Sequence, residues 1–356
     1  MKRRTFLELA GAGAAAMTLP ARIPATAKPA PFRAWSWVHG STDEGINWRA
    51  RFGRLREAGI SGVLVGGGAT ARIAEAAHSE GMAFHAWTWI LNRTGDAWVK
   101  ANHPEWFDVS RNGDSSLTKP PYVGYYQWLC PTRPAVRDYL ATKVREIADI
   151  PGVDAVHLDY IRHPDVILPV GLWEKYGLVQ DHEMPEYDFC YCEVCRATFA
   201  ERAGYDPLSR PDPTADVAWR EFRWQSVTDL VRILTDAAHE RGKEISAAVF
   251  PTPALARLQV RQAWDLWPLD SVFPMTYHRF HEQDIPWIGT AVREGMAAIP
   301  TSEPLYAGLY LPDLDPTASA EAVQVVRDAG GAGVAFFEAG GLTDRHLAAL
   351  RGVLRS

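Results

Sequence analysis

The sequence predicts a single (β/α)8 TIM barrel. Eight short apolar runs alternate with amphipathic stretches of helical period from residue 32 to the C-terminus. Most of these runs are apolar on both faces, as in the strands of a parallel sheet that helices cover. Eight such strand–helix units in about 325 residues favour a closed barrel over an open doubly wound sheet.

The expected strands are the apolar runs 33–38, 62–65, 83–90, 155–161, 245–250, 271–277, 305–310 and 333–337. The expected helices are the amphipathic stretches 48–58, 71–80, 134–148, 217–241, 288–298, 319–329 and 344–354. Glycine closes several of these stretches, as is typical of helix C-termini. The glycines concerned are Gly59, Gly81, Gly242 and Gly330.

Two connections are too long to be ordinary turns. They cover residues 92–133 after the third strand and 163–216 after the fourth. Both leave the carboxyl ends of strands, the face on which barrel enzymes build their sites. We therefore expect them to form the walls of a cleft, with 163–216 as an insertion in the barrel domain.

Residues 1–27 have the pattern of a twin-arginine export signal. Arg3 and Arg4 precede a short Gly- and Ala-rich apolar stretch, and Ala25-Thr26-Ala27 forms a cleavage site. No later run approaches the roughly 20 apolar residues of a membrane-spanning helix. We expect a barrel domain of residues 28–356, exported to the periplasm or the exterior, with no membrane span.

The composition of the chain indicates which kinds of molecule it can bind. Apolar residues make up 47% and charged residues 22% of the chain, so disorder has no compositional support. The net charge of −6, without a basic run in the barrel domain, argues against nucleic acid as a partner. The chain has 14 Trp, 12 Tyr and 13 Phe, and such rings form flat apolar platforms in sugar-binding clefts.

The strongest local signal is the segment 157–164, His-Leu-Asp-Tyr-Ile-Arg-His-Pro. Asp159 interrupts the end of a buried strand, where an unpaired carboxylate is costly. Strand alternation places His157 and Asp159 on one side and Leu158 on the other. Asp159 is therefore either part of a structural ion pair with Arg162 or a functional group that faces the cleft.

This segment resembles the fourth-strand signature of the glycoside-hydrolase-like family 10 proteins. The similarity extends over nearly the whole barrel domain, and its other segments are 125–131, 176–183, 187–195, 245–251 and 272–278. The resemblance implies a TIM barrel that acts on a poly- or oligosaccharide. By analogy with related barrel glycosidases, it implies that Asp159 is the nucleophile or a charge stabiliser.

Glycoside hydrolysis normally needs a second carboxyl group. The candidates are Glu338, directly after the eighth strand, and Asp181 or Glu183 on the long fourth-strand connection. Glu338 is equally well explained as a rim carboxylate. The fifth and seventh strands end in Phe250-Pro251 and Leu309-Tyr310, so neither supplies the strand-end Glu of other glycosidase clans.

Aromatic and polar residues at the ends of strands and in the third connection are candidates for substrate binding. They are Trp37, His39, Trp87, Trp89, Trp128, His157, Arg162, Tyr277 and His278. At least half of the tryptophans are expected to fill the barrel instead.

Two other functions remain open. The histidines at strand ends, with carboxylates, suit a divalent-metal-dependent hydrolase or isomerase, although the His-Glu-x-x-His pattern is absent. A barrel that binds glycans without cleaving them is the non-enzymatic alternative. The leading hypothesis, a glycoside hydrolase, requires no cofactor for catalysis.

All four cysteines lie in the two long connections. Cys130 belongs to the first, and Cys190, Cys192 and Cys195 cluster in the second. In an exported protein they are expected to form disulfides, with Cys192–Cys195 and Cys130–Cys190 as one of three possible connectivities. Folding in the reducing cytoplasm before export equally permits a structural zinc site with four thiolate ligands. Either would fix the long connection over the cleft.

Overall fold

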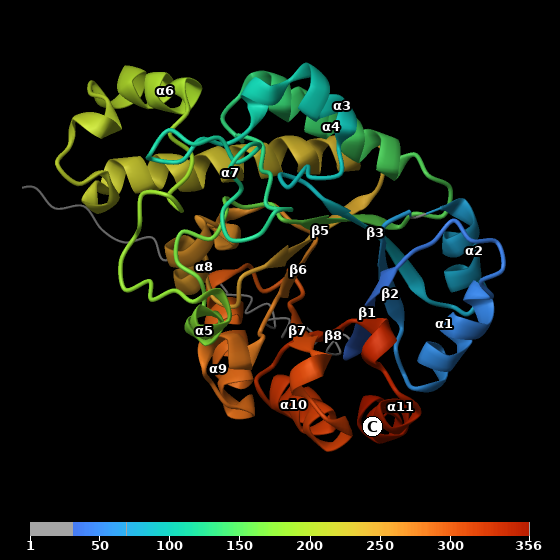
Figure 1. Cartoon of the computed structure of the whole chain (residues 1–356). Coiled ribbons are helices and arrows are strands. Elements are labelled where there is room, and N and C mark those ends of the chain that lie inside the picture. The colour runs from blue at the N-terminus through green and yellow to red at the C-terminus, as the bar shows by residue number, and fades with distance from the viewer. Residues whose placement is uncertain (1–30, 69, 356) are drawn as a thin grey trace, which may run out of the picture. The chain divides into compact units, whose positions relative to one another are not determined.

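The computed structural model describes residues 31–68 and 70–355, so the predicted export signal lies outside the described residues. Eight parallel strands form one sheet in the order β6-β5-β4-β3-β2-β1-β8-β7. They are β1 (Arg33–His39), β2 (Gly62–Gly66), β3 (Ala83–Trp89), β4 (Ala155–Asp159), β5 (Glu244–Val249), β6 (Ser271–Pro274), β7 (Tyr306–Tyr310) and β8 (Gly333–Phe337). Parallel bridges Val272–Leu305 and Met275–Gly308 join β6 to β7 and close the ring. The predicted (β/α)8 barrel is confirmed (Figure 1).

Seven helices, six between strands and one after β8, match the predicted amphipathic stretches. They are α1 (Trp48–Glu57), α2 (Ala71–Ser79), α4 (Pro134–Ala148), α7 (Val217–His239), α9 (Ile285–Ala298), α10 (Pro316–Asp328) and α11 (Asp344–Leu354). Helices α9 and α10 begin earlier than predicted. Asp284 and Asp315 cap them by accepting backbone N–H bonds, and each helix has a proline in its first turn.

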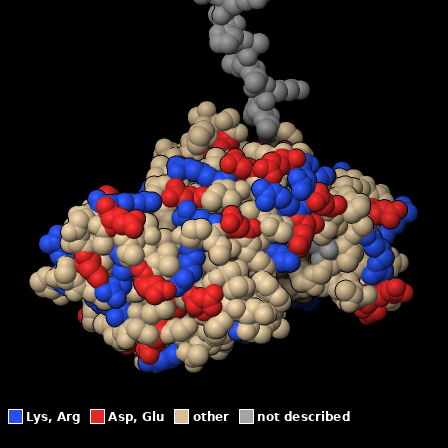
Figure 2. Space-filling model, turned by 90° about the horizontal axis from the view of Figure 1, so that it is seen from above, with Lys and Arg blue, Asp and Glu red and all other residues tan. Residues whose placement is uncertain are grey.

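The connections contain helices that periodicity did not reveal. They are α3 (Ala97–Asn102), α5 (Trp173–Tyr176), α6 (Glu193–Ala203) and α8 (Pro253–Val260). Around α6, a satellite core of buried aromatic residues is separate from the barrel core; it includes Phe189, Tyr191, Phe199, Trp219 and Phe222. No helix of the described chain is long and apolar enough to cross a membrane. On the face shown in Figure 2, basic and acidic side chains are interspersed, without a large area of either sign.

Large aromatic side chains fill the barrel interior. Trp35, Trp37 and Trp87 pack there with Phe273 and Tyr306. Strand β2 makes room for two of the indoles, because it begins and ends with glycine. A Cβ atom on Gly62 would lie 2.3 Å from the Trp35 ring, and one on Gly66 would lie 2.6 Å from the Trp87 ring.

We predict that Gly62→Ala destabilises the protein by about 1–3 kcal/mol, because the rigid, enclosed Trp35 ring must move to admit the methyl group. Urea unfolding measures this change. The control is Gly352→Ala in α11, where an added Cβ has no neighbour within 4 Å and helix propensity favours alanine by about 0.5–1 kcal/mol. Equal stability of the Gly62→Ala and wild-type proteins would contradict the packing constraint.

Candidate active site

The carboxyl group of Asp159 lies where β3 and β4 end side by side. The register pairs Trp87 with His157 and Trp89 with Asp159. Two N–H groups hold the carboxylate: Trp87 Nε1 donates to Oδ2 at 2.9 Å, and the Tyr160 amide donates to Oδ1 at 2.7 Å. Each oxygen therefore has one fixed donor, which sets the orientation of the carboxyl plane.

Tyr160 adopts a left-handed backbone conformation, with φ of 47°. This conformation costs a residue with a Cβ atom about 1–2 kcal/mol. It ends β4 directly after Asp159 and accompanies the bond from the Tyr160 amide to the Asp159 side chain. Such strained residues cluster at functional sites.

Burial raises the pKa of Asp159, while its bonds from Trp87 and Tyr160 and the charge of Arg162 oppose that rise. Arg162 itself forms an ion pair with Asp165, at 3.0 Å, and stacks over Trp128. Among the described residues, Asp159 forms no ion pair within 4.0 Å. The structural pair Asp159–Arg162 that the sequence allowed is thus replaced by Arg162–Asp165.

Asp159 lies in a cavity of 330 Å³ at the carboxyl ends of the strands. Strand ends and the turns after them supply His39, Trp87, Trp89, Asp159, Tyr160, Phe250, Tyr277 and Phe337 to its lining. Arg162 in the turn after β4 also lines the cavity, and the two long connections supply Tyr125, Tyr126, Asp165, Leu168, Pro169, Leu172, Lys175 and Tyr176. Both connections therefore form walls of the cleft. At its mouth, the exposed rings of Trp89 and Tyr125 stack with an interplanar angle of 29°.

The insertion is held against the barrel rim at Gly171. A Cβ atom there would lie 2.3 Å from the Arg279 carbonyl oxygen and 3.0 Å from that of Phe280. Gly171 belongs to a 3-10 turn, Val170–Leu172, and Arg279 to another, His278–His281, which follows β6. This close backbone contact sets the position of the cleft wall that carries Leu172, Lys175 and Tyr176.

Of the four predicted catalytic carboxylates, Asp159 alone lines the cavity. Asp181 is exposed and pairs with His182 at 2.6 Å. Glu183 forms an ion pair with the buried Arg261. Glu338 lines a neighbouring hollow with Trp48 and Arg51, and it contacts the cavity indirectly, through a 2.7 Å bond to His39.

Of the nine predicted binding residues, five line the cavity: His39, Trp87, Trp89, Arg162 and Tyr277. The other four are buried: Trp37, Trp128, His157 and His278. Burial raises the pKa of Tyr277 well above its usual value, and the charge of Asp159 adds to this rise.

His157 is part of a hydrogen-bonded chain inside the barrel. Trp37 Nε1 donates to His157 Nε2 at 3.2 Å, so Nδ1 carries the proton of the neutral ring and donates to Ser246 Oγ at 2.9 Å. The Ser246 hydroxyl then donates to His85 Nδ1 at 3.0 Å. Burial lowers the pKa of both histidines, that of His85 to about 3, so both are neutral core groups.

Several cavity residues were not predicted as site residues. They are Tyr125, Tyr126, Lys175, Tyr176, Phe280 and His281. Tyr125-Tyr126 and Lys175-Tyr176 lie in the long connections, which have no periodicity to show where a side chain points. The density of tyrosine in segments expected to flank the cleft was the available signal.

One group of three or more potential metal ligands occurs among residues 31–68 and 70–355, and it is formed by the four cysteines. The described strand-end histidines do not form such a group with carboxylates. The alternative of a divalent-metal-dependent hydrolase or isomerase therefore has no cluster of potential metal ligands among the described residues of the cleft.

No protein-family model matches the chain, and no curated protein matches it in sequence. Solved structures match it in fold. The glycoside hydrolase domain of PgaB (BpsB) from Bordetella bronchiseptica superposes with a TM-score of 0.63 at 13% identity, over 91% of this chain and 99% of that one. The catalytic domain of a Paenibacillus polymyxa β-amylase gives 0.60 at 10% identity, over 91% and 98%. A β-galactosidase from Halorubrum lacusprofundi gives 0.61 at 15% identity, over 91% and 58%.

The raised pKa of Asp159 predicts a pH-dependent difference between wild type and Asp159→Asn. The wild type loses stability as pH rises from the unfolded pKa of Asp159, about 3.9, through its raised folded pKa. The loss is about 1.4 kcal/mol for each unit by which the folded pKa exceeds the unfolded pKa. Asparagine does not titrate, so the variant does not show this loss. We expect the free energy of unfolding of the variant minus that of wild type to increase across this window and to be constant below it. Urea unfolding across a pH series measures this; a difference that falls with pH would contradict the raised pKa.

The contact at Gly171 predicts that Gly171→Ala separates the insertion from the turn after β6. We expect faster amide hydrogen exchange over residues 168–178 and a loss of about 1–3 kcal/mol in stability, because backbone atoms block the methyl group. Hydrogen exchange detected by mass spectrometry measures this, with Gly352→Ala as the control. Unchanged exchange in this segment would show that the contact does not hold the wall.

Proposed function

We propose that this protein is an exported glycoside hydrolase that cleaves glycosidic bonds in a poly- or oligosaccharide, with Asp159 as nucleophile or charge stabiliser. The observation that carries the proposal is an unpaired carboxylate, oriented by two N–H donors, in a cavity walled by aromatic rings. The twin-arginine pattern of residues 1–27 supports export.

The geometry suits a reaction in which positive charge develops on a sugar ring. The transition state of glycoside hydrolysis resembles an oxocarbenium ion, which a fixed carboxylate stabilises or attacks. Asp159 needs to be ionised for either role, and the bonds from Trp87 and Tyr160 favour that form against the effect of burial. Trp89 and Tyr125 offer flat apolar faces at the mouth on which sugar rings can stack.

Glycoside hydrolysis also needs a general acid that protonates the leaving group. Asp165 also lines the cavity, but its carboxylate is already engaged by Arg162 at 3.0 Å, so it is not free to act on a sugar. Of the three predicted candidates, Glu338 alone contacts a cavity residue, His39. We therefore propose Glu338, with His39 beside it, as the source of the proton for the leaving group.

The fold neighbours agree with action on glycans, since their names describe a glycoside hydrolase domain, a β-amylase and a β-galactosidase. Barrels of this type carry many unrelated activities, so the likeness supports the proposal as an analogy. The physical argument for glycoside hydrolysis comes from the Asp159 cavity itself.

A glycan-binding barrel without catalysis is the second candidate. It is favoured by the presence of one unpaired carboxylate, rather than two, in the described lining of the cavity. It requires saturable sugar binding that Asp159→Asn leaves unchanged.

We predict that the purified protein releases reducing ends from at least one member of a broad polysaccharide and oligosaccharide panel. Asp159→Asn should lower the rate by about 10²–10⁴-fold or more, because the neutral amide neither attacks nor stabilises the developing charge. Glu338→Gln should lower it comparably. Asp181→Asn, at an exposed carboxylate outside the cavity, is the control and should retain wild-type activity.

Equal rates for Asp159→Asn and wild type would refute the assigned role. Failure of folded wild type to release sugar from any substrate, together with saturable binding to one, would favour the binding-only barrel.

A further inference from the structure

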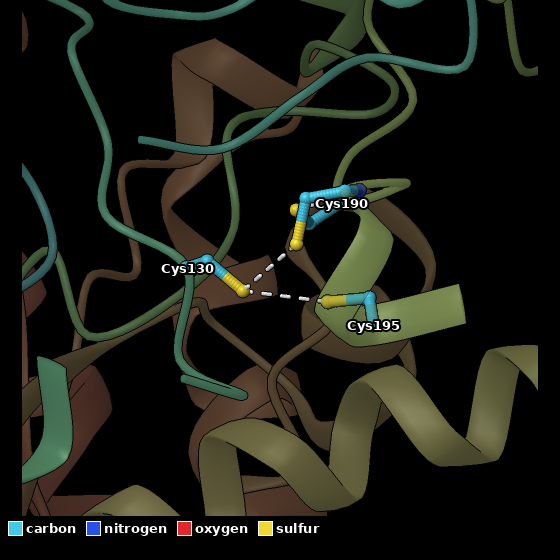
Figure 3. A group of neighbouring side chains, drawn as sticks. Cys130, Cys190 and Cys195 are labelled. Carbon is cyan, nitrogen blue, oxygen red and sulfur yellow. Dashed lines mark hydrogen bonds between the residues drawn. The ribbon is translucent and has the colours of Figure 1, made fainter. Parts of the chain in front are cut away.

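The four cysteines converge on one point in the satellite core. Cys130 lies just before α4, and the other three lie just before α6 or in its first turn. All four are buried, and their Sγ atoms lie within 4.8 Å of one another. Figure 3 shows the side chain of Cys130 pointing toward those of Cys190 and Cys195.

The spacing of the sulfur atoms fits a tetrahedron better than two pairs. With zinc–sulfur bonds of about 2.3 Å, the edges of a regular tetrahedron of thiolates are about 3.8 Å. Cys130 Sγ lies 3.3 Å from Cys195 Sγ and 3.6 Å from Cys192 Sγ. One sulfur thus has two close partners on different residues, so the arrangement singles out no two-by-two pairing.

The surroundings of the sulfurs suit bound thiolates. The amides of Val109 and Cys192 donate to Cys190 Sγ, at 3.5 and 3.4 Å. The Thr132 hydroxyl lies 3.2 Å from Cys195 Sγ, where it can donate to a thiolate. Such bonds stabilise metal-bound thiolates and fix their orientation.

A cation is available to offset the charge of such a centre. Four thiolates around Zn²⁺ carry a net charge of −2. Arg133 lines the same surface hollow as Cys192. One of its Nη atoms lies 3.7 Å from the exposed carboxylate of Glu193, while its buried Nε has no hydrogen-bond partner among the described residues. An unpartnered guanidinium N–H next to this cluster is accounted for if the cluster is anionic.

We propose that Cys130, Cys190, Cys192 and Cys195 bind one zinc ion in a closed, structural site. Four protein ligands leave no open position for a substrate or water, so the ion has no catalytic role. It joins the third-strand connection to the insertion, whose local apolar core is small.

The cysteine cluster is also linked to the cleft through packed side chains. Trp128, two residues before Cys130, packs against Tyr160 with ring centroids 5.1 Å apart and lies under Arg162. Loss of the ion should therefore loosen the insertion first and the floor of the cleft second.

Metal analysis of the purified full chain tests the proposal without reference to activity. We expect about one zinc per chain, an intact mass without disulfides, and four thiols that react with a thiol reagent only after a chelator and denaturant are added. Replacement by cobalt(II) should give the visible absorption of a tetrahedral thiolate complex. Two disulfides, or four free thiols with no zinc, would overturn the proposal.

A matched pair of variants assigns the ligands. Cys192→Ser should lose the zinc, whereas Glu201→Gln, at an exposed position of α6 away from the cluster, should keep it. If Cys192→Ser does not fold, chelation of the wild type replaces it: the melting temperature should fall and return when zinc is added. An unchanged melting temperature after complete removal of zinc would overturn the structural role.

Discussion

Filling the barrel with indole rings is the constraint on which the site depends. Trp35 and Trp87 fit because β2 begins and ends with glycine. The position that this packing gives to Trp87 directs its Nε1 at the Asp159 carboxylate on the next strand. Core packing and site geometry are therefore coupled, because Trp87 both fills the barrel and donates a hydrogen bond to Asp159, the candidate catalytic group.

The sequence predicts the barrel because its signals are local. Apolar runs and amphipathic periods locate all eight strands and seven of the helices, and strand alternation places Asp159 on the same side of its strand as His157. The same reasoning does not locate α5 and α6, because the insertion folds on a satellite core and on the barrel rim rather than on a periodic face.

At the candidate active site, the sequence predicts some residues correctly and not others. Asp159, Trp89 and Tyr277 were predictable because they lie at or just after strand ends, where the parallel fold brings side chains together. Trp37, Trp87 and His157 each lie two residues before a strand end, yet of the three only Trp87 lines the cavity, because depth in a barrel depends on stagger rather than on the pattern of one strand. Glu183 and Lys175 lie in irregular chain, where only tertiary contacts decide that one pairs with Arg261 and the other lines the cavity.

The polar groups inside and above the barrel differ in how they are satisfied. His85, Ser246 and His157 form a closed chain of neutral hydrogen bonds, which removes their cost of burial without leaving a group free to react. Arg162 and Asp165 neutralise each other. Asp159 receives two N–H bonds but pairs with no cation of residues 31–68 and 70–355, and the turn that supplies one of these bonds includes a strained Tyr160. A protein selected for stability alone would gain by pairing or removing this carboxylate, and this cost is the physical basis for the proposal that Asp159 acts on a ligand in the aromatic cavity.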